Sequence, residues 1–407
     1  MRIIIGGIFI MSGLVKAIDL WGVVYKIEEY FSVWGVSAPR SLVEMLSLGL
    51  ATAEFLLGLM LLVGAYRRTV VWGLLAMMAF MLPLTVYIYL YSPVSDCGCF
   101  GDFIHLSNGA TLVKNILIVI PLIYLLRDNK RVTGLYHPYI QWIVGVIAAC
   151  YVVFVGMYGL IVQPMVDFRS FPPGSMLSGD ENQDMDAEPV FEFVYERNGH
   201  QKTFSMSELP DSTWTFVSRN LVSGAVMAEN DLTELYITDD GEDVTDDVIA
   251  TSGEQILITL PLYERADVSY TYIINELEDV MNDRNGSLIE IASVTGDELD
   301  EWRDLSMASY PIYFGESVML KELARGVMAA VYIKDGRIIW KRTLGSINSS
   351  MLENPDEDGD ILESFEPLGP QALGMLSIGG VALLFVVWLI GAVPSMQKHF
   401  NKKPKQI

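Results

Sequence analysis

The stretch Ser95-Asp-Cys-Gly-Cys-Phe-Gly-Asp102 lies between two apolar runs, each long enough to cross a membrane. It holds two of the three cysteines of the chain, Cys97 and Cys99. A Cys-Gly-Cys turn brings two sulfur atoms close by covalent geometry alone, and Gly98 supplies a permissive backbone. We therefore place the chemistry of the chain at this loop. The alternative is a tight turn whose cysteines form a static disulfide or merely pack.

Apolar runs on both sides of this loop predict a helical membrane bundle, because each run is near the roughly 20 residues that span a bilayer. They are Ile3 to Ile18, Leu42 to Gly64, Val70 to Tyr91, Ala110 to Leu126, Ile140 to Val162 and Ala372 to Val393. No small-residue cleavage site follows the first run, so we expect a retained helix and six spans. Small residues would let this first helix pack closely against its neighbours, namely Gly6, Gly7, Ser12 and Gly13.

Basic residues indicate the orientation. They fall on one side of the membrane if the six helices alternate, and that side is expected to be cytoplasmic. They are Arg67, Arg68, Arg127, Lys130, Arg131, Lys398, Lys402, Lys403 and Lys405. The sequence thus predicts a multi-pass protein of the cytoplasmic membrane with both termini in the cytoplasm. The loop after the first helix, the cysteine loop and a large domain would share the periplasmic side.

Acidic residues define that domain. The chain of 407 residues has a formal net charge of −23, yet 51% of it is hydrophobic. Of its 50 acidic residues, 42 lie between Val166 and Gly369. Two unlike parts therefore share the chain, a lipid-embedded one and an acidic soluble one. The acidic field and the lack of a basic stripe exclude nucleic acid as an expected partner.

Ionisable residues within the apolar runs point to the same side. Lys16, Asp19, Glu44 and Lys114 lie near the outer ends of their helices, at the level of the cysteines. Lys16 and Lys114 are candidates for stabilising a thiolate, with snorkelling to lipid headgroups as the alternative. Glu54 lies about halfway along its helix. We expect its carboxyl group to be bound to a partner or protonated, with a role in proton transfer or in contact with a quinone.

A family resemblance rests on four stretches. These are Ser12-Gly-Leu-Val-Lys16 with Asp19, Glu54-x-x-x-Gly58, Asp96-Cys-Gly-Cys-Phe-Gly-Asp102 and Lys114-Asn115. Residues 1–130 resemble the DoxX-like and MauE-like membrane proteins, which are four-helix bundles tied to periplasmic redox processes. MauE proteins are implicated, with a thioredoxin-like partner, in maturing the disulfide-rich subunit of methylamine dehydrogenase. DoxX proteins take their name from a subunit of a thiosulfate:quinone oxidoreductase.

Vitamin-K-epoxide-reductase-like proteins offer an analogy, since they pass electrons from periplasmic dithiols to quinone, although their Cys-x-x-Cys is absent here. We therefore expect no tightly bound cofactor, with quinone as a possible electron acceptor.

The remaining chain divides into segments by composition. They are a fifth transmembrane helix at 139–163, a linker at 164–189, a β-rich element at 190–240, an α/β domain at 241–345, an acidic linker at 346–370, a sixth helix at 371–394 and a basic tail at 395–407.

Strand and helix patterns alternate in the α/β domain. We expect strands at 255–260, 287–293, 310–314, 329–333 and 337–342, with helices at 269–283 and 296–307. This order predicts a mixed sheet covered by helices. Residues 190–195 and 201–205 predict a β-hairpin before it.

The domain resembles a thioredoxin-like domain over about residues 240–345, in particular in its final stretch Val331-Tyr-Ile-Lys-Asp-Gly-Arg-Ile-Ile. It departs from that pattern where the chemistry would lie. Residues 261–268 contain no Cys-x-x-Cys, and Met328 stands where a cis-proline is usual. The resemblance therefore implies a redox-silent module that docks a client protein.

Metal binding is the rival use of the loop. Cys97, Cys99 and His105 with Asp96 or Asp102 could supply four ligands. Structural zinc sites favour two to four residues between paired cysteines, so the one-residue spacing argues against it and we expect no metal.

Two functions remain open. In the first, Cys97 and Cys99 cycle between dithiol and disulfide, Lys16 or Lys114 favours the thiolate, and electrons pass to a membrane acceptor or a thioredoxin-like protein. In the second, the chain is a non-enzymatic assembly factor that binds another envelope protein. The sequence leaves open whether the chain is an enzyme.

Cys150, in the fifth helix, is expected to pack as a small apolar residue.

Overall fold

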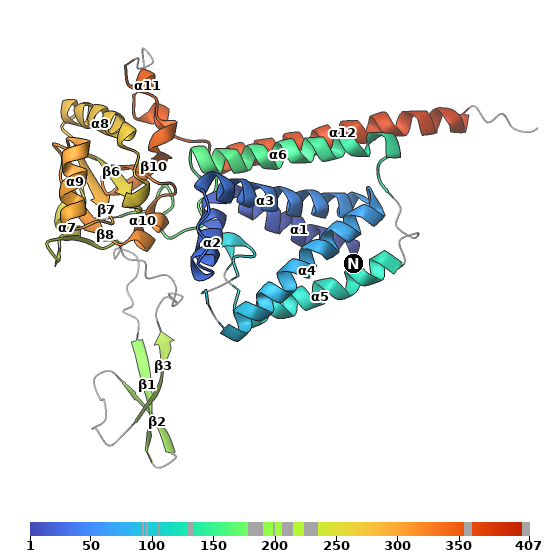
Figure 1. The fold of residues 1–407 in the computed structure, drawn as a ribbon, viewed down its shortest axis with the longest axis horizontal. Helices are drawn as coiled ribbons and strands as arrows, with labels where there is room; N and C mark the ends of the chain where they lie inside the picture. Colours follow the sequence, from blue (N-terminus) through green and yellow to red (C-terminus); the bar gives the residue numbers. More distant parts are fainter. Residues whose placement is uncertain are drawn as a thin grey trace, which may run out of the picture.

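The computed structural model describes residues 1–91, 93–94, 97–104, 106–127, 134–177, 190–197, 200–205, 215–223, 235–353 and 360–400. Several residues of the sequence argument lie outside these ranges, namely Ser95, Asp96, His105, Lys130, Arg131, Lys402, Lys403 and Lys405. A helical bundle forms one part of the molecule, and an α/β domain lies at one end of it (Figure 1). A small separate sheet extends from that domain.

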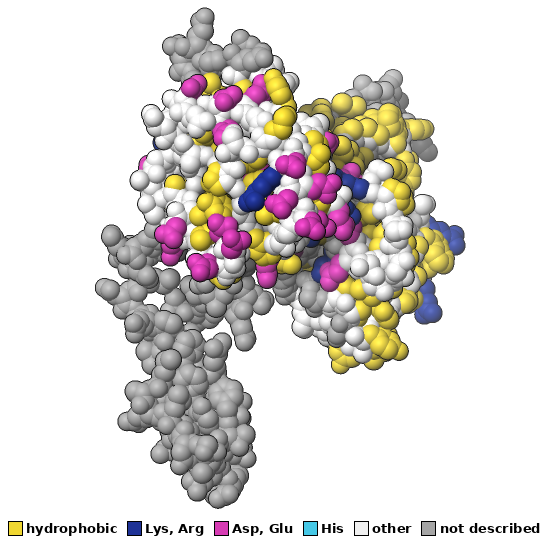
Figure 2. Space-filling view, turned by 60° about the vertical axis from the view of Figure 1, so that its left-hand side comes forward, with side chains coloured by type: hydrophobic (Ala, Val, Ile, Leu, Met, Phe, Trp, Pro, Cys, Tyr) yellow, Lys and Arg dark blue, Asp and Glu magenta, His cyan; other side chains and the backbone are white. Residues whose placement is uncertain are grey.

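The bundle contains α1 (Arg2–Ile18), α3 (Arg40–Val63), α4 (Arg67–Tyr91), α5 (Asn108–Arg127), α6 (Gln141–Ile161) and α12 (Pro370–Phe400). Within the described residues, five helices are long and apolar enough to cross a membrane, namely α3, α4, α5, α6 with the turn before it, and α12. A sixth span results if α1 and the helix after it count as one. Apolar side chains also cover the surface of the bundle, while acidic ones gather on the α/β domain (Figure 2). The chain is thus a multi-pass membrane protein.

The segment after the first helix differs from the expected loop. It forms α2 (Leu20–Val33), which bends by 93° from α1. The carboxylate of Asp19 caps α2 by accepting a hydrogen bond from the backbone N–H of Gly22 at 3.2 Å. Trp21 and Val24 of α2 are buried in the same core as the α/β domain. No long apolar run marks this helix in the sequence, because α2 buries only one face.

Helices α1 and α3 pack at glycines. A Cβ atom at Gly13 would lie 2.4 Å from the backbone nitrogen of Phe55, and one at Gly6 would lie 2.9 Å from the carbonyl oxygen of Gly58. The expected close packing is confirmed at these two positions. The same prediction is wrong at Gly7, where a Cβ atom would have no neighbour within 4 Å.

The α/β domain contains a seven-stranded mixed sheet with the order β10-β9-β6-β7-β8-β4-β5. Its strands are β4 (Ile237–Asp239), β5 (Glu242–Asp243), β6 (Glu254–Leu260), β7 (Ser287–Ala292), β8 (Ile312–Gly315), β9 (Ala329–Lys334) and β10 (Arg337–Thr343). Strands β6, β7 and β8 are parallel, and the other pairs are antiparallel. The predicted mixed sheet is thereby confirmed.

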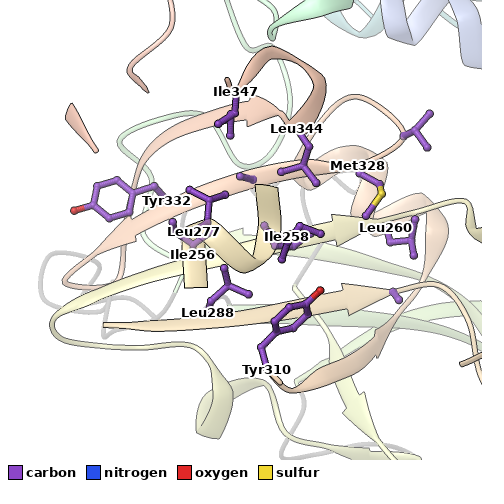
Figure 3. Close-up of a cluster of buried hydrophobic side chains, with 14 of the residues drawn as sticks. Ile256, Ile258, Leu260, Leu277, Leu288, Tyr310, Met328, Tyr332, Leu344 and Ile347 are labelled. Atoms are coloured by element: carbon purple, nitrogen blue, oxygen red, sulfur yellow. The ribbon is translucent and has the colours of Figure 1, made fainter. Parts of the chain in front are cut away.

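Helices cover both faces of this sheet because side chains alternate along each strand. On one face, Ile256, Ile258 and Leu260 of β6 pack with Leu277 of α8 and with Leu288 (Figure 3). Leu257 points to the other face, against α10. The helices of the domain are α7 (Thr245–Val248), α8 (Thr271–Asp283), α9 (Asp297–Ser306), α10 (Ser317–Leu323) and α11 (Ser349–Glu353).

Connecting segments add to this core. Residues 164–177, expected as part of a linker, run along β10, where the N–H of Gly174 donates to the carbonyl of Ile338 at 2.7 Å. The segment after β10 packs back on this strand, since the indole N–H of Trp340 in β10 donates to the carbonyl of Leu362 at 2.7 Å. These described stretches therefore hold the α/β domain close to α6 and α12.

The separate sheet has the order β2-β1-β3. It is made of β1 (Val190–Arg197), β2 (His200–Ser205) and β3 (Thr215–Ser223). The predicted β-hairpin is confirmed, since β1 and β2 pair antiparallel from Glu192 with Ser205 to Arg197 with His200. The third strand was not expected from the sequence.

The glycine contact between α1 and α3 generates a stability prediction. We expect Gly13→Ala to lower the free energy of unfolding by about 1–3 kcal/mol, because its methyl group would overlap the α3 backbone. Gly7→Ala, on the same helix but facing open space, serves as the control and should not lower stability, because alanine favours a helix more than glycine does. Thermal unfolding of the two variants in detergent measures this. Equal melting temperatures would show that the close approach does not contribute to stability.

Candidate functional site

The two cysteines lie at the end of the bundle that carries the α/β domain. The described part of their loop, residues 97–104, connects α4 and α5 and lies beside α2 (Figure 1). We call these residues the cysteine loop. Side chains of α1, α2 and α5, together with Arg325 after α10, contact this loop, so segments far apart in the sequence meet there.

Lys16 and Glu54 form a buried ion pair beneath this loop. The Lys16 ammonium lies 2.7 Å from Glu54 Oε2, and both side chains are almost fully buried. The same ammonium donates to Ser12 Oγ at 2.8 Å and to the carbonyl oxygen of Cys99 at 2.6 Å. Its three donors therefore meet three acceptors, which a buried ammonium requires.

Ser12 links the same groups. Its hydroxyl oxygen lies 2.7 Å from Glu54 Oε2 and 2.7 Å from the carbonyl oxygen of Cys99. With one proton, the hydroxyl donates to one of these acceptors at a time. The Lys16, Glu54 and Ser12 network thus ties α1 and α3 to the backbone of the cysteine loop.

The sulfur atoms of Cys97 and Cys99 lie 3.1 Å apart as free thiols, and both residues are half-buried. Gly98 between them has a φ of +66°, a conformation that side chains disfavour. A Cβ atom at Gly98 would also lie 2.9 Å from Cγ of Lys26 on α2. The hydroxyl of Tyr30 donates to the carbonyl of Cys97 at 3.3 Å. The turn is therefore shaped by α2 as well as by its own sequence.

Lys114 of α5 lies on the other side of the loop. Its ammonium is 4.6 Å from the ring centroid of Phe100, which is within the range of a cation–π contact. Lys16 and Lys114 therefore bring positive charge to the thiols from two helices. The structure brings together all five site residues predicted from the sequence, namely Cys97, Cys99, Lys16, Lys114 and Glu54.

The two thiols have divergent acidities. A hydrogen bond from the Cys97 thiol, followed by the charges of Lys114 and Lys16, lowers the pKa of Cys99 to about 6. Donation of that hydrogen bond, together with burial, raises the pKa of Cys97 well above its usual range. The pair therefore gives up one proton easily and retains the second, as expected for coupled groups. One thiolate is available near neutral pH, and only a thiolate is a good nucleophile.

Arg325 is a functional residue that the sequence argument missed. It follows α10 and is buried, with its guanidinium bound to both carboxylate oxygens of Asp19, including a 2.8 Å contact from Nη2 to Oδ2. The same Nη2 group pairs with Asp102 of the cysteine loop. Arg325 thus joins the α/β domain to the bend after α1 and to the cysteine loop. No local pattern marks it, because its partner Asp19 is 306 residues away in sequence.

A second buried charge cluster supports this junction. Asp167 pairs with Arg169 at 2.7 Å and with Lys341 of β10 at 2.9 Å. Burial alone would raise the pKa of Asp167, but the charges of Arg169 and Lys341 hold it below its usual range. Burial lowers the pKa of Lys341 to about 8. Arg169 also donates to the carbonyl oxygens of Lys321 and Glu322, so the cluster fixes α10 next to Arg325.

A cavity of about 800 Å³ opens from the cysteine loop between α2, α3 and α4. The cysteines and the Lys16 network lie at its polar end. Its remaining walls are mostly apolar and include Phe9, Leu46, Leu50, Met77, Met78, Phe80, Met81 and Leu84. The site therefore combines a dithiol, two cations and a carboxylate with a large apolar space.

The structure also bears on the suggested metal site and on Cys150. Among the described residues no group of three or more His, Cys, Asp or Glu could hold a metal ion, and two of the suggested ligands, Asp96 and His105, lie outside those residues. Cys150 does not pack in the core as expected. It is exposed on α6, because its side chain falls on the outer face of that helix.

Comparisons with known proteins agree with the bundle. Residues 1–127, which span α1 to α5, match the model of the family described as methylamine utilisation protein MauE. Residues 189–222, which include β1, β2 and all but the last residue of β3, match that of a domain of unknown function (DUF8463). Nothing matches in the comparisons with curated proteins and with solved structures. The resemblance to MauE is thus confirmed for the part that holds all five predicted site residues.

The Arg325 junction generates a second prediction. We expect Arg325→Gln to destabilise the docking of the α/β domain by about 3–5 kcal/mol, because it leaves the buried Asp19 carboxylate unpaired. Hydrogen exchange measured by mass spectrometry should then rise in α2 and in the cysteine loop. The control is Arg303→Gln on α9, since Arg303 is half-exposed and lies 3.8 Å from Asp300. Unchanged protection in Arg325→Gln would show that the junction does not hold the domain.

The thiol pair generates a third prediction. In a Cys150→Ala background, the rate of alkylation should rise with pH to a plateau, with a midpoint near pH 6, because the Cys99 thiolate forms there. Cys97→Ala removes the hydrogen bond and should move this midpoint upwards. Lys114→Met should move it upwards by less. Stopped-flow alkylation across the pH range measures all three, and an unmoved midpoint in Cys97→Ala would contradict the assigned cause.

Proposed function

We propose that this protein is a membrane thiol-disulfide component that helps to mature an envelope protein. The observation that carries the proposal is the 3.1 Å approach of the Cys97 and Cys99 sulfur atoms beside two lysines. A structural disulfide needs no cations near it, whereas a catalytic pair benefits from a stabilised thiolate. Since the matched family is named for methylamine utilisation, we infer a client protein of that process.

The exchange begins with the pair as a disulfide. A client thiolate attacks the Cys99 or the Cys97 sulfur, the bond between the two sulfurs breaks, and a mixed disulfide forms. The second client thiolate then attacks that mixed disulfide. The client leaves with a new disulfide, and its two electrons and the accompanying protons remain on Cys97 and Cys99.

Two features of the pair favour this direction. The charges of Lys114 and Lys16 act to lower the pKa of both cysteines, and thiols of lower pKa leave faster. A disulfide across Cys-Gly-Cys closes a very small ring, and strain makes such a bond more oxidising. Both features favour transfer of the disulfide to the client.

The topology of the α/β domain supports our proposal that this domain is thioredoxin-like. The parallel pair β6–β7 is flanked at β6 by the antiparallel β9–β10 hairpin, and helices cover both faces. Its described residues contain no cysteine. We propose that it acts in this pathway without exchanging disulfides itself.

The position of this domain changes the role expected for it. The chain segments after β6 and before β9, where a thioredoxin-like domain would meet a client, face α2 of the same chain. Arg265 pairs with Glu28 at 2.5 Å, and the Tyr25 hydroxyl donates to the carbonyl of Gly326 at 3.0 Å. We therefore propose that this surface is a cap fixed over the cysteine loop, and that a client docks elsewhere on the domain.

We propose the orientation expected from the sequence, with the site on the periplasmic side of the cytoplasmic membrane and both termini in the cytoplasm. The arrangement of the helices supports it. The cysteine loop and the α/β domain lie at one end of the bundle, while the N-terminus and the last turns of α12 lie at the other (Figure 1). The basic residues Arg67 and Arg68 begin α4 at that second end.

The redox state of the pair tests the proposal. Membranes that contain the Cys150→Ala chain would be equilibrated at graded glutathione potentials and then treated with a thiol reagent that shifts the mass. We expect one two-electron transition, with both thiols free below it and neither free above it. Cys97→Ser and Cys99→Ser variants should each show a single thiol and no such transition.

Two outcomes would contradict the proposal. Thiols that stay free at every potential, or a disulfide that never reduces in the folded protein, would exclude a redox cycle. The non-enzymatic assembly factor would then be the remaining function. Client maturation that survives in the double Cys97→Ser, Cys99→Ser chain would lead to the same conclusion.

A further inference from the structure

We propose that the cavity beside the cysteine loop binds a membrane quinone, which reoxidises the Cys97 and Cys99 pair. The inference rests on the proposed function, because a pair that oxidises clients must pass its electrons on. It adds a site and a ligand class to that function. The volume of about 800 Å³ lies within the roughly 300–1,000 Å³ typical of small-molecule sites.

Part of the cavity wall faces the lipid. Leu46 of α3 and Phe80 of α4 both line the cavity, and their exposed fractions are 46% and 63%. Phe80 lies eleven residues before the end of α4, which corresponds to about 16 Å along the helix. This part of the wall is therefore at the depth of the hydrocarbon core, while the exposed Trp34 at the end of α2 and Val318 of α10 line the cavity as well. We infer that the mouth lies at Leu46 and Phe80, where a ligand with an apolar tail can enter from the membrane.

One part of the cavity wall is polar and holds the candidate redox pair. Cys97, Cys99, Lys16, Lys114 and Glu54 all line it. The Lys114 ammonium can donate to a carbonyl oxygen of a quinone ring, and it can stabilise the negative charge that develops during reduction. Lys16 adds positive charge nearby, although its own three donors are already bound. A long apolar space that leads to a dithiol and two cations matches a prenylated quinone, with its ring at the sulfurs and its tail towards the lipid.

The chemical step balances with quinone as the oxidant. The Cys99 thiolate and the Cys97 thiol form one sulfur–sulfur bond and release two electrons. Quinone takes up both electrons and two protons and becomes quinol. One proton comes from the Cys97 thiol, and the other was released when Cys99 ionised, so it returns through water or the Lys16 and Glu54 pair. The disulfide formed is the state that accepts electrons from a client.

A phospholipid is the other ligand that could enter from the membrane. Its acyl chain fits the apolar walls, and its phosphate would pair with Lys16 or Lys114. Lys16 already has three acceptors, including the Glu54 carboxylate, which would repel a phosphate. A neutral quinone ring meets no such repulsion. Lys114 lines the cavity and could meet either ligand, so displacement of a phospholipid by quinone decides between them.

Decylubiquinone serves as the probe in the test, with the reduced full-length chain in nanodiscs and a Cys150→Ala background. Quinol formation, followed by absorbance, should consume one quinone for each disulfide formed. Leu46→Trp narrows the mouth and should raise the quinone concentration for half-maximal rate by about tenfold or more. Leu42→Trp is the matched control, because Leu42 is 44% exposed on the same helix but does not line the cavity.

Binding is measured separately from chemistry in the double Cys97→Ser, Cys99→Ser chain, by quenching of tryptophan fluorescence. We expect this chain to bind decylubiquinone without reducing it, and Leu46→Trp to weaken that binding. Failure of quinone to oxidise a pair that glutathione disulfide does oxidise would overturn the quinone site and leave the proposed function intact. Equal effects of Leu46→Trp and Leu42→Trp, or a phospholipid that quinone cannot displace, would overturn it as well.

Discussion

A single buried ammonium group fixes the centre of this protein. Burial of an unpaired Lys16 would cost several kcal/mol, so its three donors need acceptors within the fold. The structure supplies them from α1, from Glu54 of α3 and from the carbonyl of Cys99. Because one acceptor belongs to the cysteine loop, the same requirement that stabilises the helix pair also places the sulfur atoms.

Arg325 imposes a second requirement of the same kind from the other side. Its guanidinium needs carboxylates, and it finds Asp19 at the bend after α1 and Asp102 in the cysteine loop. The loop is thus held by the bundle through Lys16 and by the α/β domain through Arg325. A rearrangement of either part would expose or unpair a buried charge. The α/β domain, whose described residues contain no cysteine, therefore still controls the geometry of Cys97 and Cys99.

The sequence predicted the elements better than their contacts. The spans and the alternating strands and helices could be predicted because periodic apolar patterns are local. Helix α2 could not, since Trp21 and Val24 are buried by a domain that begins two hundred residues later. Lys16 and Glu54 were separate candidates, and no spacing could pair residues on different helices. Arg325 had no local signal for the same reason.

The position of the cysteine pair limits what can reach it. One side of the loop faces the large cavity, whose wall includes lipid-facing side chains of α3 and α4. Another side borders a hollow of about 10 Å³ next to Ile104 and Thr111, which has room for about one water molecule. In the proposed cycle, a client protein cannot enter the bilayer core, and a quinone tail has no reason to leave it. The proposed cycle therefore requires that the two partners reach the cysteine pair from different sides of this boundary.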